Sequence, residues 1–147
     1  STKERDIMKK KKNKKPVKQE IKKAKKFLEY YYMIPEEVEV KRLSGYIHCV
    51  DEEMVEIWRE LNLMEVVLVS DSLIFQDSME SFEDPADLEF LKHHGIKTVY
   101  QVSYEEQDQE MAKKILAELL KETGGFLCCD TEDFAPFYGL EDLDKLA

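Results

Sequence analysis

The sequence predicts an α+β protein in which helices pack on a largely antiparallel sheet. Two strand–helix–strand patterns lead to this prediction, one between residues 96 and 129 and the other between residues 46 and 69. The chain has 147 residues, a length that suits one domain with a core of its own.

The pattern between residues 96 and 129 has clear signals at each junction. Residues 96–104 alternate apolar and polar side chains, as in a half-buried strand. The helix that follows has acidic residues first and lysines later, which suits the helix dipole. Gly124 and Gly125 can take positive φ just past its end, and residues 126–129 predict a short buried strand. The apolar stripe of this helix consists of Met111, Ile115, Leu116, Leu119 and Leu120.

The pattern between residues 46 and 69 is read in the same way. Residues 46–50 suit a strand, Asp51 suits an N-cap, and residues 66–69 suit a buried strand. Between them, a helix is predicted from the spacing of Met54, Ile57, Trp58 and Leu61. Two such units are similar to the split βαβ arrangement of the ferredoxin-like plait.

The two units imply a set of buried side chains. Trp58→Ala is accordingly expected to cost roughly 3–5 kcal/mol of stability. The side chains that we expect to be mostly buried are Trp58, Val67, Val69, Tyr100, Val102, Ile115, Leu119 and Leu127.

Further elements are predicted outside the two units. An N-terminal helix begins at Val17 and stops before Pro35, and residues 38–43 suit a strand. Residues 71–95 form an insertion with a short strand and a helix, which Asp84 and Pro85 open and Gly95 ends. A short acidic helix closes the chain at residues 140–146.

Charge is distributed unevenly along the chain. Residues 1–26 contain 13 Lys or Arg and 3 Asp or Glu, a balance of +10, whereas the remainder contains 9 basic and 29 acidic residues, a balance of −20. We predict a disordered basic tail at residues 1–16 and a single α+β domain at residues 17–147. The acidic domain is repelled by phosphate backbones, so nucleic acid can be bound only through the tail.

The lysines of the tail have two interpretations. They solubilise the chain or fold back on its acidic body, or else they contact RNA, DNA or an anionic membrane surface. The candidate residues for such a contact are Lys9, Lys10, Lys11, Lys12, Lys14 and Lys15.

Cysteine usage and hydropathy predict a cytoplasmic protein. The three cysteines are odd in number and contain no CxxC pair, which suits a reducing compartment. No apolar run approaches the ~20 residues that span a bilayer, and the basic start lacks the apolar segment of a secretory signal.

No established catalytic motif is present in the sequence. GxSxG, HExxH, GxxxxGK[ST] and GxGxxG are all missing. His48 and Cys49 would face opposite ways in a strand, and His93 and His94 suit the carboxyl end of a helix, so ordinary packing explains all four. We therefore predict no catalytic residue, no metal ligand and no cofactor.

The segment from residue 130 to residue 139 is the most unusual part of the chain. Three acidic residues leave a strand and an aromatic loop follows. Three interpretations remain: helix capping with core packing, a protein-binding patch, and a metal or catalytic site. The candidate protein-interaction residues are Asp130, Glu132, Asp133, Phe134, Phe137 and Tyr138.

Three functions are compatible with these observations. The first is a non-catalytic protein-interaction or inhibitory module, of the immunity or regulator type, whose acidic surface binds a basic protein partner. The second is a regulator attached to nucleic acid or ribosomes by the lysine-rich arm. The third is a carboxylate-dependent enzyme, which requires Asp130, Glu132 and Asp133 to converge with Asp71 or Glu105.

Overall fold

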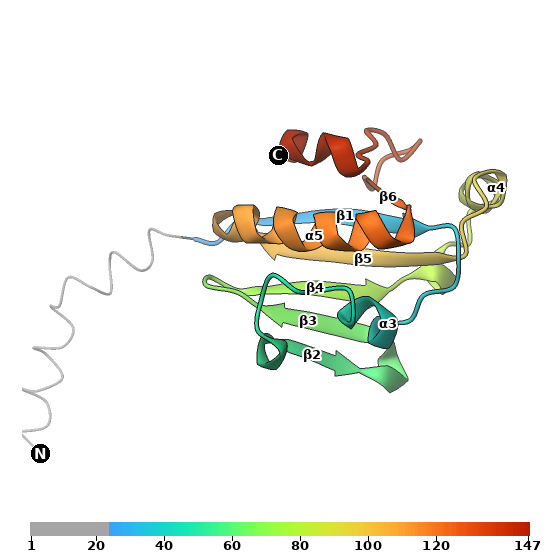
Figure 1. The fold of residues 1–147 in the computed structure, drawn as a ribbon. Helices are drawn as coiled ribbons and strands as arrows, with labels where there is room; N and C mark the ends of the chain where they lie inside the picture. The colour runs from blue at the N-terminus through green and yellow to red at the C-terminus, as the bar shows by residue number, and fades with distance from the viewer. Residues whose placement is uncertain (1–23) are drawn as a thin grey trace, which may run out of the picture.

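The computed structural model describes residues 24–147 and has a mixed architecture of helix and sheet, as predicted (Figure 1). Six antiparallel strands form one sheet in the order β2-β3-β4-β5-β1-β6. The strands are β1 (Phe27–Ile34), β2 (Val55–Trp58), β3 (Leu63–Val67), β4 (Ser72–Asp77), β5 (Thr98–Glu105) and β6 (Phe126–Cys128). The helices are α3 (Val40–Ser44), α4 (Pro85–His93), α5 (Gln109–Thr123), and 3-10 helices η1 (Glu52–Met54), η2 (Arg59–Leu61), η3 (Met79–Ser81), η4 (Glu106–Asp108) and η5 (Leu140–Lys145).

The main core lies on one face of the sheet. Helix α5 lies along β1 and β5, and α3 lies at the end of β2 and β3 (Figure 1). The buried stripe of α5 meets alternate side chains of the strands, among them Tyr32, Phe75 and Tyr100. Tyr100, Val102, Ile115, Leu119 and Leu127 are buried as predicted.

A smaller core lies on the opposite face, at one end of the sheet. Met33, Val99 and Cys128 point to this face and meet Leu91 of α4 and Phe134 of the C-terminal segment. Because these elements cover only this end, the rest of the face has no described helix or loop packed on it.

The predicted unit at the C-terminal half is present as strand β5, helix α5 and strand β6. Strand β1 pairs with both β5 and β6, so the two strands that α5 connects are parallel to each other and separated by β1. Gly124 ends α5 at φ 70°, as its position predicted. The helix of residues 85–93 is also confirmed, since the Asp84 side chain accepts a hydrogen bond from Ala86 N.

The predicted unit at residues 46–69 is wrong in its first strand and its helix, while its second strand is present in part as the end of β3. Residues 46–50 form no strand, and residues 52–61 form η1, β2 and η2 in place of a helix. Val55 and Ile57 pack toward the main core, and Glu56 and Trp58 of β2 point the other way. Three side chains that were predicted to be buried are exposed: Trp58 at 38%, Val67 at 43% and Val69 fully. The large stability cost expected for Trp58→Ala consequently no longer holds.

Two more predicted elements are wrong at the N-terminal half. The helix expected to run up to Pro35 is β1 from residue 27 onward, and the strand expected at residues 38–43 is replaced by α3 from Val40. Adjacent tyrosines suit a strand, because Tyr30 and Tyr32 enter the main core while Tyr31 faces the other side. The predicted tail at residues 1–16 and the start of that helix at residues 17–23 lie outside the described residues.

Candidate functional site

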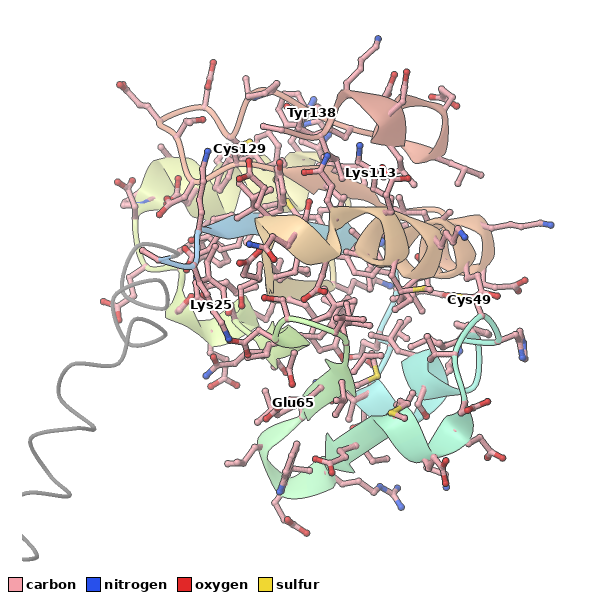
Figure 2. All side chains as sticks on the ribbon, turned by 90° about the vertical axis from the view of Figure 1, so that its left-hand side faces the viewer. Lys25, Cys49, Glu65, Lys113, Cys129 and Tyr138 are labelled. Carbon is pink, nitrogen blue, oxygen red and sulfur yellow. The ribbon has the colours of Figure 1, made fainter. Side chains whose placement is uncertain are left out.

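The uncovered part of the sheet is the most distinctive surface of the described chain. It is formed by the strand side chains that point away from α5, which we call the open sheet face. In Figure 2, which looks along the strands, Glu65 lies toward this side and Cys49, in the loop beside α5, lies toward the other. The members of the open sheet face are Phe27, Glu29, Glu56, Trp58, Leu63, Glu65, Val67, Ser72, Ile74, Gln76, Gln101 and Ser103, and Tyr31, whose ring packs against Phe82 and Phe134, marks its border with the smaller core.

Strand register arranges these side chains in rows across the sheet. One row is acidic at both ends, because Glu56 and Glu65 occupy its first two positions and Glu29 its last. The neighbouring row begins with Trp58 and ends with Tyr31. In strand order the acidic row is Glu56, Glu65, Ile74, Ser103 and Glu29, and the aromatic row is Trp58, Leu63, Gln76, Gln101 and Tyr31.

Glu56 and Glu65 face each other directly on β2 and β3. Like charges at directly opposed positions destabilise a sheet. The six described strands contain no lysine or arginine that would compensate them. The fold therefore keeps an unfavourable pair of carboxylates on an exposed, partly apolar surface.

Lys25 pairs with Asp71 in the connection between β3 and β4, and four other cations of this half of the molecule lie beside α3. They line a hollow of about 850 Å³ beside α3, together with the acidic residues Glu37, Glu39, Asp77 and Glu80, so the hollow is close to neutral. These cations are Lys41, Arg42, Arg59 and Lys97. The open sheet face by contrast has three carboxylates, those of Glu29, Glu56 and Glu65, and no Lys or Arg among its members.

Glu65→Gln is expected to raise the free energy of unfolding by about 0.5 kcal/mol at low ionic strength, because it removes the repulsion from Glu56. Salt should shrink the gain, since it screens exposed charges. Urea unfolding at two salt concentrations measures both effects. Glu132→Gln, an equal change at an exposed loop position, serves as the control and should leave stability unchanged. Destabilisation by Glu65→Gln at low salt would contradict this reading of the pair.

The predicted interaction residues of the C-terminal segment do not form one exposed patch. Phe134 is only 3% exposed, with φ 66°, and packs against Phe90 at a ring distance of 4.7 Å. Tyr138 pairs with Leu127 through two backbone hydrogen bonds of 2.8 Å, which extends the sheet beyond β6. Phe137 alone of the three aromatic residues is largely exposed, at 46%.

The three carboxylates of this segment are held apart. Asp133 accepts hydrogen bonds from Ala135 N and Thr131 Oγ1, which shape the loop. Asp130 lies close enough to α4 that it helps raise the pKa of Asp87, after the larger effect of burial and the effect of Asp84. Glu132 is exposed. This arrangement supports the interpretation of loop capping and core packing for most of the segment.

The enzyme alternative finds no constellation in the described part of the chain. Within residues 24–147, no three His, Cys, Asp or Glu side chains are grouped closely enough to hold a metal ion. Glu105 is buried, with its carboxylate accepting a hydrogen bond from Gln107 N, and Asp71 pairs with Lys25 at 3.2 Å. Neither one converges with Asp130.

The cysteines are poor nucleophiles. Burial raises the pKa of the Cys128 thiol to about 12, and burial together with a hydrogen bond to Glu118 raises that of Cys49 to about 11. Burial also raises the pKa of Cys129. All three thiols are consequently protonated near neutral pH, whereas thiolate is the nucleophilic form.

The contacts of the histidines belong to the packing of the fold. His48 and Cys49 lie in a loop, where their backbone N–H groups donate to Glu118 Oε1 at 2.9 and 3.1 Å. His93 ends α4 and His94 follows it, as predicted, with the His94 ring 4.2 Å from that of Phe90.

Sequence reasoning missed the open sheet face. The only local signal was the alternation of Val55, Glu56, Ile57 and Trp58, which the helical spacing of neighbouring apolar residues obscured. The opposition of Glu56 and Glu65 depends on how β2 pairs with β3, and no local pattern encodes it. The candidate lysines of the tail lie outside the described residues.

Comparison of the chain with protein-family models, with curated proteins and with solved structures found no match. Among the helices of the described residues, none combines the length and the apolar character needed to cross a membrane.

Proposed function

We propose that this chain is a non-catalytic, acidic protein-interaction or inhibitory module that binds a basic protein partner through the open sheet face. The observation that carries the proposal is the pair Glu56 and Glu65, which forms no ion pair with a cation of residues 24–147 and lies on a surface that also exposes Trp58. A cationic side chain of a partner placed between the two carboxylates would remove their repulsion and add attraction.

The size and composition of the face suit a protein partner. Five strands at a spacing of about 4.8 Å extend the acidic and aromatic rows over roughly 19 Å. Phe27, Trp58 and Val67 are partly exposed along it and supply the apolar contact area that interfaces use. Trp and Tyr are enriched among the residues that dominate binding energy, and the aromatic row begins with the partly exposed Trp58.

The whole body favours capture of a basic partner. Residues 24–147 contain 29 Asp or Glu and 11 Lys or Arg, so the field around the described chain is strongly negative. Such a field speeds association with a cationic protein and slows association with nucleic acid.

We also propose that β4, β5, β1 and β6, with α5, correspond to part of a ferredoxin-like plait. The support is the split βαβ unit, in which β1 lies between the strands that α5 connects. The segment from α3 to β3 takes the place of the other helix, and it adds β2 and β3 to the sheet.

Affinity capture from the native cell extract tests the function. The full chain is compared with the double variant Glu56→Gln/Glu65→Gln and with Glu122→Gln/Glu132→Gln, which changes the charge equally away from the face. We expect the full chain and the second variant to retain one stoichiometric protein rich in Lys and Arg. Titration of that purified protein should show affinity about tenfold lower for the first variant at low salt, mainly through slower association.

Two results would overturn the assignment. Equal affinity of the wild type and the Glu56→Gln/Glu65→Gln variant would remove the open sheet face from the interaction. Retention of nucleic acid or ribosomes alone, lost when residues 1–16 are deleted, would move the function to the lysine-rich arm.

A further inference from the structure

The two edges of the described sheet differ. At the β6 edge, Leu127 is paired with Tyr138, so a following segment of the chain covers part of it. Strand β2 has β3 on one side and no described strand on the other. The outward N–H and C=O groups of an edge strand are a template for one more strand.

A groove runs beside this free edge on the α3 side. It has a volume of about 190 Å³, and it is lined by the apolar side chains of Ile47, Val55 and Ile57 together with Ser44, Gly45 and Glu52. Val55 and Ile57 belong to β2 itself, so the groove lies directly below the path that an added strand would follow.

The other side of the same edge is acidic and aromatic. Glu56 and Trp58 alternate with Val55 and Ile57 and point to the open sheet face. Glu53 precedes β2 and Glu60 follows it, whereas Glu52 lines the groove on the α3 side. An added strand would thus meet apolar surface through one set of its side chains and carboxylates through the other set.

We propose that β2 binds an extended segment of the basic partner as a seventh, antiparallel strand, in which aliphatic residues facing the groove alternate with Lys or Arg residues facing Glu56 and Trp58. This inference rests on the proposed function and names the mode of binding. Backbone hydrogen bonds to β2 supply affinity, and the two alternating surfaces select the side chains.

The negative charge at the β2 edge favours a cationic segment over a second copy of this chain. A second copy of this chain would bring another set of carboxylates against Glu56, which is unfavourable. A cationic segment would instead relieve the repulsion between Glu56 and Glu65, and its Lys or Arg can stack on the exposed Trp58 ring.

The test uses the full chain and an acetylated, amidated octapeptide of alternating lysine and valine. Two N-methylated isomers are compared, one methylated on the valine amides and one on the lysine amides. Because alternate N–H groups of a strand point to opposite sides, one isomer keeps the hydrogen bonds to β2 and the other loses them. We expect one isomer to bind like the parent peptide and the other about tenfold more weakly or worse. A peptide with the same residues in two blocks should also bind more weakly.

Amide hydrogen exchange followed by NMR locates the contact. We expect the outward amides of Val55–Trp58 to exchange rapidly in the free protein and to be protected by the parent peptide. Equal binding of the two isomers, or no peptide binding, would overturn the added strand. Protection of these amides in the free protein would also overturn it, since residues 1–23 or a second copy would then occupy the edge. None of these results tests the role of Glu56 and Glu65 in binding the partner. Unchanged partner affinity of the Glu56→Gln/Glu65→Gln variant would instead refute the proposed function itself.

Discussion

Gly125→Ala is expected to destabilise the protein by about 3 kcal/mol or more, or to prevent folding. A Cβ atom at this position would lie 2.2 Å from the carbonyl oxygen of Met33, a distance that no side chain adopts. The obstacle is the backbone of β1, next to β6, so relief requires the two strands to separate. Overpacking against movable side chains already costs about 1–3 kcal/mol, and a backbone obstacle costs more.

The preceding glycine provides the matched control. Gly124 has φ 70° and open space around its Cα, so Gly124→Ala adds backbone strain and no clash. We expect a cost of about 1–2 kcal/mol for an alanine in the left-handed region. Urea unfolding of both variants measures the difference. A smaller loss for Gly125→Ala than for Gly124→Ala would mean that β6 is not seated against β1 in this way.

The two glycines show what local signals can encode. Both were predicted as residues able to end a helix, and this is the role of Gly124. The need for glycine at the next position comes from a strand almost a hundred residues earlier, and no neighbouring residue indicates it. The unit β5–α5–β6 was predictable because alternation, acidic first turns, apolar spacing and the helix end all favoured the same assignment.

The N-terminal half was mispredicted because the same residues fit both a helical and a strand periodicity. Met54, Ile57, Trp58 and Leu61 have helical spacing, while Val55 and Ile57 alternate with polar or exposed residues. Pairing with β3 decides in favour of a strand, because it buries Val55 and Ile57 and satisfies the backbone. The same holds for β1, where pairing with β5 and β6 overrides the apparent helical stripe.

The candidate surface was harder to predict than the fold. Membership of the open sheet face depends on which neighbour each strand has and on the register between them. The aromatic residues of the C-terminal segment look alike in the sequence, yet Phe134 packs in the smaller core and Phe137 remains exposed. Phe134 has φ 66° and its ring packs on Phe90 of α4, a contact between distant segments that the local sequence does not indicate.

Asn62→Ala is expected to cost about 3 kcal/mol of stability, the second largest of these effects. Asn62 has φ 48° in the connection between η2 and β3. Its Oδ1 accepts a hydrogen bond of 2.8 Å from Val40 N, and its Nδ2 donates one of 2.8 Å to Asp77 Oδ2. Alanine would adopt this φ at a cost of about 1 kcal/mol and would leave the partly buried Val40 N–H unpaired at about 1–3 kcal/mol, whereas the bond to Asp77 is exposed.

Asn62→Gly separates the two causes. Glycine takes the positive φ freely but loses the same side-chain hydrogen bonds, so its cost should be about 1 kcal/mol smaller than that of alanine. Asn62 joins the β2–β3 hairpin to α3 and to the end of β4. In both variants we therefore expect amide exchange to accelerate more in β2 and β3 than in α5. Equal costs would exclude the backbone contribution, and a cost below 0.5 kcal/mol for both would contradict the bonding described. The proposed binding of a basic partner at the open sheet face implies that affinity falls as the hairpin opens, because the hairpin holds Glu56 opposite Glu65.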